Sequence, residues 1–185
     1  MNIKLFRRLQ TAFSILLFVG VFLICWHTTE FKLSEIQLSF WGIDSKLGWI
    51  WNSCLIVLAF SIFINVHFFV KLHGRLHEKY TEFIRYSFLL TSIFLFLTGF
   101  VDLTHYLHYV TAYLYFFSYP LVVFLFAHLN RKHIQYKEWR LHTIFSVCMV
   151  VLPMLVIEVF HGKAIAETIH SVIVIGWNVW ILTID

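Results

Sequence analysis

Carboxylates and histidines recur three residues apart in the second half of the chain. The groups with this spacing are Asp102-x-x-His105-x-x-His108, Glu158-x-x-His161 and Glu167-x-x-His170. Side chains three apart lie on one face of a helix. Glu-x-x-His on two helices is the arrangement found in di-metal carboxylate bundles. Histidines and carboxylates can also hold a single zinc ion, which keeps a position open for an activated water.

This pattern predicts a site for a metal ion or for acid–base chemistry. The candidate metal ligands are His105, His108, Glu158, His161, Glu167 and His170, and zinc or another divalent metal is the expected cofactor. The candidate catalytic groups are Glu167, His108 and Asp102. Glu167, His170 and His108 are the strongest candidates, because each lies about one turn inside an apolar segment, where an ionisable group needs a partner.

Other interpretations of these residues stay open. They can line a polar pocket that holds no metal. They can also be interfacial residues, because polar side chains at helix ends near water lose little hydration. Asp102 can cap the helix that follows it, and Glu158 can pair with His161. A haem ligated by His67 and His128 is a further alternative.

The composition places these groups in a membrane protein. The chain has 185 residues, of which 60% are hydrophobic, 19% aromatic and 13% charged. Its mean hydropathy is +0.80. Soluble domains carry about 25% charged residues, so a soluble domain and a disordered chain are both excluded.

Six apolar runs are long enough to cross a bilayer, which takes about 20 residues. They are Leu9–Trp26, Trp49–Val70, Tyr86–Leu103, Tyr106–Leu129, Leu141–Phe160 and Ala164–Ile184. The third and fourth runs are separated by a very tight turn at Asp102, Thr104 and His105. The predicted fold is therefore an all-α, six-helix transmembrane bundle that forms one domain over residues 1–185.

The basic residues predict the orientation. Of the 14 Lys and Arg residues, all except Lys32, Lys46 and Lys163 fall on the side that carries the N-terminus. Cytoplasmic loops collect Lys and Arg, so we expect both termini in the cytoplasm and the chain in a plasma (inner) membrane. The same rule accounts for the net charge of +4, and no nucleic-acid partner is expected.

The segment from residue 27 to 48 is the longest predicted loop, on the outer side. Ile36, Leu38 and Phe40 alternate with polar residues, which predicts a short strand or an interfacial cap. The tryptophans Trp41, Trp49 and Trp51 are expected at the headgroup level.

Two features concern the interior of the bundle. Pro120 and Pro153 each interrupt an apolar run, so kinks are expected, with the freed carbonyls bonded by neighbouring helices. Aromatic residues are spread around all sides of the run Tyr106–Leu129. This distribution predicts that the fourth helix is central and buried.

The C-terminal half shows a family resemblance. The residues that carry it are Thr98-Gly99-Phe100, His108, Ala112 and Ala166-Glu167. With the six apolar runs, they resemble the Frag/DRAM-like six-helix membrane proteins, whose bacterial branch has no known function. Eukaryotic members are linked to lipid remodelling of GPI anchors and to autophagy-related membrane events, which implies a lipid-facing role. The chain departs from the family pattern in its many histidines and in lacking a proline after Phe100.

Two functions follow from the sequence. The first is an enzyme acting on membrane lipids at the outer leaflet, as a metal-assisted hydrolase or transferase. The second is a non-catalytic oligomeric membrane protein: a sensor, a pore-former or an accessory subunit of a larger complex. The expected partners are membrane lipids and either further copies of the chain or another membrane protein. The first function requires the outer carboxylates and histidines to converge.

Overall fold

A computed structural model describes residues 3–28, 38–44, 46–73, 78–101, 106–160 and 163–184. Within these ranges the chain forms six α-helices and a short 3-10 helix, η1 (Leu38–Ile43). The helices are α1 (Ile3–Thr28), α2 (Gly48–His73), α3 (Glu78–Phe100), α4 (Tyr106–Asn130), α5 (Tyr136–Phe160) and α6 (Lys163–Trp180). The predicted all-α class is confirmed.

The helices differ in how well they could cross a membrane. Helices α1 to α5 each contain a stretch long and apolar enough to do so. Helix α6 has only 18 residues, a length of about 27 Å. Its polar residues Glu167, His170 and Asn178 lower its mean hydropathy. The sixth predicted span is thus shorter and more polar than expected. Helices α3 and α5 begin earlier than predicted, because an apolar run marks only the part of a helix inside hydrocarbon.

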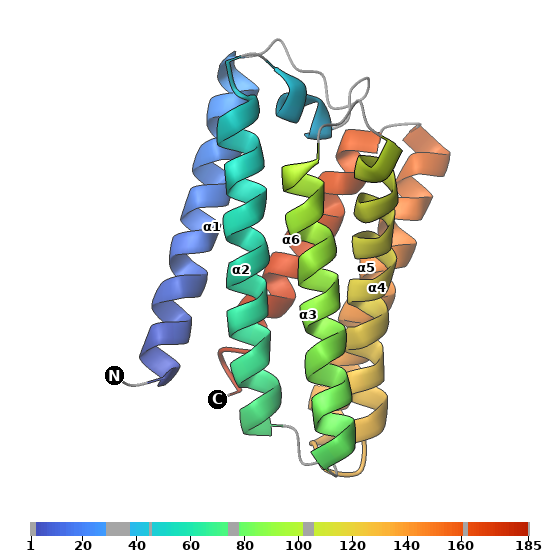
Figure 1. Cartoon of the computed structure of the whole chain (residues 1–185). Coiled ribbons are helices and arrows are strands. Elements are labelled where there is room, and N and C mark those ends of the chain that lie inside the picture. The colour runs from blue at the N-terminus through green and yellow to red at the C-terminus, as the bar shows by residue number, and fades with distance from the viewer. Residues whose placement is uncertain are drawn as a thin grey trace.

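The helices form a closed bundle in which neighbours in sequence are neighbours in space (Figure 1). Helix α6 packs against α5 and also contacts α1, α2 and η1, so it closes the arrangement. Both termini lie at the end of the bundle opposite η1 (Figure 1). We refer to the other end, which carries η1, as the η1 end.

Helix α6 supplies the centre of the core. Trp177 is fully buried, and its ring packs against Phe69, Phe88, Tyr119 and His142 at centroid distances of 5.9 to 6.1 Å. Its Nε1–H donates to Nδ1 of His142 at 3.0 Å. The partners of Trp177 come from α2, α3, α4 and α5, so one side chain of α6 ties four helices together.

A chain of buried hydrogen bonds crosses the bundle through Asn178, the residue after Trp177. The Arg7 Nε–H donates to Asn65 Oδ1 at 3.1 Å, and the Asn65 amide donates to Asn178 Oδ1 at 3.0 Å. The Asn178 amide in turn donates to the Tyr119 hydroxyl at 2.8 Å. The bonds join α1, α2, α6 and α4. Hydrogen bonds of this kind stabilise helix association inside membranes.

The expectation that α4 is buried on all sides is wrong. Tyr115 and Tyr119 point into the core, but Tyr109, Tyr113 and Phe117 are exposed. These three residues are four apart and form an outward-facing aromatic stripe. Aromatic residues suit a lipid-facing surface as well as a core. Their presence on all sides of the run therefore did not show which sides are buried.

For the segment before α2, a short strand or an interfacial cap was expected, and the strand is wrong. Residues 38–43 form η1 rather than a strand, while Ile36 lies outside the described residues. Trp49 is 71% exposed, as expected for an interfacial residue. Trp41 and Trp51 are buried instead. Their rings pack edge to face, with a distance of 5.0 Å between the ring centroids.

A short turn connects η1 to α2. The Asp44 carboxylate accepts hydrogen bonds from the backbone N–H groups of Lys46 and Leu47, both at 2.8 Å. The bond from Leu47 and then that from Lys46 lower the pKa of Asp44 below its ordinary value, because they favour the charged form. The turn fixes where η1 sits over the bundle.

We predict that Gly99→Ala destabilises the protein while Gly20→Ala does not. A Cβ at Gly99 would lie 2.9 Å from the Asn52 carbonyl oxygen and 2.9 Å from the Leu55 Cβ, so α2 and α3 would have to separate. A Cβ at Gly20 meets nothing within 4 Å. Overpacking of this kind costs about 1–3 kcal/mol. Thermal unfolding of the detergent-purified variants measures the difference, and equal melting temperatures would contradict the close packing of α2 and α3.

Candidate functional site

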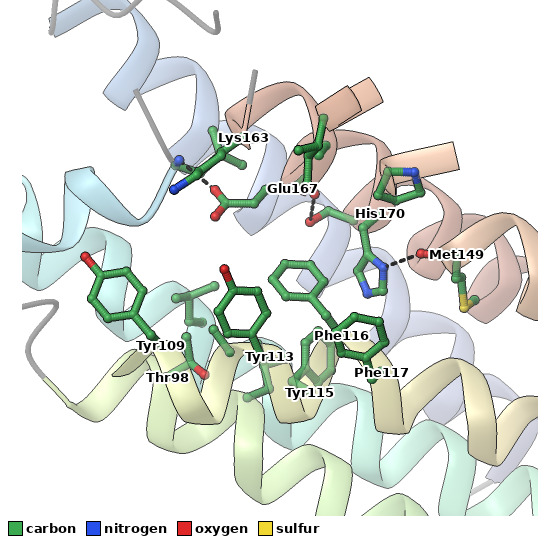
Figure 2. Close-up of a pocket in the computed structure, with 18 of the residues that line it drawn as sticks. Thr98, Tyr109, Tyr113, Tyr115, Phe116, Phe117, Met149, Lys163, Glu167 and His170 are labelled. Carbon is green, nitrogen blue, oxygen red and sulfur yellow. Dashed lines mark hydrogen bonds between the residues drawn. The ribbon is translucent and has the colours of Figure 1, made fainter. Parts of the chain in front are cut away.

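A cavity of about 270 Å³ lies toward the η1 end, with walls formed mainly by α4, α5 and α6 (Figure 2). Single residues or pairs from α1, η1, α2 and α3 also contribute to the wall: Phe18, Leu38, Trp51, Leu55, Leu95 and Thr98. Most of the wall is apolar. The polar side chains on it include Thr98, His108, Lys163, Glu167, His170 and Ser171.

The exposed part of the cavity wall lies mainly on α4 and α5, which indicates a lateral opening between these two helices. Tyr109, Tyr113 and Phe117 on α4 line the cavity and are exposed, as are Met154 and Ile157 on α5. Phe117 lies 11 residues into α4, or roughly 16 Å from the start of that helix. The opening therefore extends well into the spanning part of the bundle, where the surroundings of a membrane protein are hydrocarbon.

Glu167 lies at the end of the cavity nearest η1. Its Oε2 accepts a hydrogen bond of 2.7 Å from the backbone N–H of Leu38. This bond fastens η1 to α6 and closes the cavity at that end. Lys163, one turn earlier on α6, is exposed and also lines the cavity. The polar end of the cavity thus carries a carboxylate and an ammonium group.

His170 lies one turn deeper and is 1% exposed. Its Nδ1 is 2.9 Å from the carbonyl oxygen of Met149 on α5, and Figure 2 shows the ring directed at that oxygen. Pro153, four residues after Met149, has no N–H to bond this carbonyl within the helix. The proline therefore frees the oxygen, and His170 takes the place of the missing donor. The expectation that a neighbouring helix would bond a proline-freed carbonyl is confirmed here.

This bond fixes the tautomer of His170. A carbonyl oxygen can only accept, so Nδ1 must carry the hydrogen. A neutral imidazole then has its lone pair at Nε2, and burial favours the neutral ring because a buried charge costs free energy. Nε2 of His170 is buried and has no hydrogen-bond partner among the described residues. The ring also packs against Phe116, with a centroid distance of 4.4 Å.

The other histidine of the cavity is held by its own hairpin. Nδ1 of His108 is 3.1 Å from the Val101 carbonyl oxygen, near the end of α3. The Thr98 hydroxyl lies 2.8 Å from the Phe94 carbonyl and 3.2 Å from the Thr111 hydroxyl. The bonds of His108 to Val101 and of Thr98 to Thr111 join the η1 ends of α3 and α4.

The structure brings together part of the predicted site. His108, Glu167 and His170 all line one cavity. Glu158 is exposed and is not part of the cavity wall. Asp102, His105 and His161 lie outside the described residues. Within the described ranges, no three His, Cys, Asp or Glu side chains lie close enough to hold a metal, so the zinc site stays a prediction that depends on the remaining ligands.

The two histidines considered for haem have other neighbours. An Arg85 Nη2 lies 3.2 Å from Nε2 of His67, and the ring of His128 stacks on Phe124 at 6.0 Å.

Several residues of the site were not identified from the sequence. Lys163 was assigned only to the outer loops, and Trp51 only to the interface. The signal for Met149 was present, since Pro153 marks the carbonyl four residues earlier, but nothing local shows which neighbouring helix supplies the donor.

Comparison of the chain with family models, with curated proteins and with solved structures finds no match in any of the three. The Frag/DRAM-like resemblance therefore stays a prediction.

We predict that His170 is the Nδ1–H tautomer. The Met149 carbonyl accepts from Nδ1, and the helix cannot supply a competing N–H at Pro153. Solid-state ¹⁵N NMR of histidine-labelled protein distinguishes a protonated from an unprotonated ring nitrogen, and His170→Phe identifies the resonance. A protonated Nε2 with a bare Nδ1 would contradict the assignment.

We predict that Glu167→Leu frees η1 from α6 and that Glu167→Gln largely retains the contact. Leucine removes the acceptor for the Leu38 N–H, whereas the glutamine carbonyl can still accept. Hydrogen exchange followed by mass spectrometry should show faster exchange over residues 38–43 in Glu167→Leu only. Unchanged exchange in both variants would show that other contacts hold η1.

Proposed function

We propose that this integral membrane protein binds a single-chain amphiphile in the cavity at its η1 end. The ligand enters from the bilayer between α4 and α5. Its polar head lies near Lys163 and Glu167, and its chain lies against the apolar wall formed by α4 and α5. The observation that carries the proposal is the lateral opening between α4 and α5. It lies in the spanning part of the bundle and leads into a cavity with one polar end and an apolar wall.

The distribution of polarity supports this ligand class. A water-soluble ligand would need access from an aqueous face, whereas the exposed lining residues apart from Lys163 are aromatic and aliphatic. An amphiphile already present in the bilayer would pass these side chains without leaving hydrocarbon. Its head would then meet the charged residues at the polar end, where ionisable groups inside membranes typically serve ligands.

The size of the cavity supports one chain rather than a whole two-chain lipid. Its volume of about 270 Å³ lies just below the range of about 300–1,000 Å³ typical of pockets for small ligands. The lateral opening lets the rest of a longer chain extend into the membrane.

Binding an amphiphile is a more general function than lipid hydrolysis or transfer, and it does not depend on a metal. A lipid-acting enzyme needs to bind its substrate first, so the proposal is a step that the enzyme and a lipid sensor would share. The oligomeric pore or accessory subunit, the alternative function, stays a prediction.

We predict that Ala112→Trp abolishes amphiphile binding and that Leu114→Trp does not. Ala112 lines the cavity, and an indole there would fill it. Leu114 is on the same helix but is exposed and lies outside the cavity wall. The probe is radiolabelled 1-monododecanoylglycerol, added to the protein in nanodiscs.

Specific binding should fall at least tenfold in Ala112→Trp, with Leu114→Trp equal to the wild type. Both variants must keep the helical content and melting temperature of the wild type. Equal binding by all three proteins would mean that the probe partitions into the bilayer and does not occupy the cavity.

A further inference from the structure

The polar groups of the cavity wall differ in whether their hydrogen bonds are made. Ser171 donates to the Glu167 carbonyl at 2.8 Å, and Thr98 and His108 have the partners described above. Two cavity-lining residues retain a buried polar atom with no partner in the described part of the chain: Nε2 of His170 and Nε1 of Trp51. Buried polar atoms in native proteins are nearly always bonded, so an exception needs an explanation.

The two atoms differ in what they can bind. Nε2 of His170 is an acceptor, because the Met149 carbonyl fixes the hydrogen on Nδ1. The indole Nε1–H of Trp51 can only donate. A ligand that completes the site would therefore offer a hydrogen-bond donor to His170 and an acceptor to Trp51. Hydroxyl groups and secondary amides have both, whereas an ester, an ether or a tertiary amide has no donor.

The position of His170 along α6 indicates which part of the ligand would carry the hydrogen-bond donor. Glu167 lies four residues and His170 seven residues after the start of α6, so His170 is roughly 4.5 Å deeper along the helix axis. A ligand whose head meets Glu167 would present to His170 the atoms that link its head to its chain. The linkage between head and chain is therefore the part of the ligand that His170 can contact.

We propose that His170 selects amphiphiles whose linkage carries a neutral hydrogen-bond donor, a hydroxyl or an amide N–H, over those linked by an ester or ether alone. This selection rests on the proposed binding of an amphiphile in the cavity. The donor bonds Nε2 of His170, and the Phe116 ring, packed beside the imidazole, moves aside to admit it.

The test compares two probes that differ in one hydrogen-bond donor. N-methyldodecanamide has an amide N–H, and N,N-dimethyldodecanamide has a methyl group in its place. Binding of each radiolabelled amide is measured in nanodiscs that hold wild-type protein or His170→Phe. The Ala112→Trp protein gives the background due to partitioning into the bilayer.

The wild type should bind the secondary amide about five- to tenfold more tightly, as expected for one net hydrogen bond. His170→Phe should bind the two amides equally. In the wild type, the ¹⁵N resonance of Nε2 should shift with the secondary amide and stay unchanged with the tertiary amide. This NMR measurement needs no variant, so it decides the question even if His170→Phe fails to fold.

Two other outcomes distinguish a failure of selection by His170 from a failure of amphiphile binding. Equal specific binding of both amides by the wild type, with no shift of Nε2, would overturn selection by His170 and leave the proposed function intact. Binding of both amides that does not exceed the Ala112→Trp background would overturn the proposed function, and the selection with it.

Discussion

The hydrogen bond from His170 to the Met149 carbonyl is the constraint on which the site depends. Inside hydrocarbon, a backbone carbonyl without a partner costs several kcal/mol. Pro153 creates such a carbonyl on α5, and α6 supplies the donor. This bond fixes how α6 is placed along α5. It thereby sets Glu167 one turn nearer to η1, where its carboxylate meets the Leu38 N–H.

The same constraint explains how a short helix of mixed polarity is kept inside the bundle. Helix α6 carries polar residues at three levels, and each level bonds a different neighbour: η1 through Glu167, α5 through His170, and α2 with α4 through Asn178. Between the last two levels, Trp177 fills the centre of the core. The polar groups that lower the hydropathy of α6 are therefore those that hold it in place.

The sequence specified the fold more fully than the site. Apolar runs located all six helices, because the length of a spanning segment is set by the bilayer. The three-residue spacing identified Glu167, His170 and His108, which share the cavity. It also identified Glu158, which is exposed, since spacing gives the face of a helix but not the direction of that face. The outward stripe on α4 was missed for a related reason: lipid and protein core favour the same aromatic side chains.

The cavity is better explained by ligand binding than by imperfect packing. Voids and unsatisfied polar atoms both lower stability, and a larger side chain at Ala112 could fill much of the space. The wall instead combines a small residue, an acceptor fixed by a proline-freed carbonyl, and an aromatic opening toward the bilayer. Local features that oppose stability in this way are typical of functional sites. These features involve α4, α5 and α6 together, and one shared requirement, room and a partner for a ligand, accounts for their meeting in one cavity.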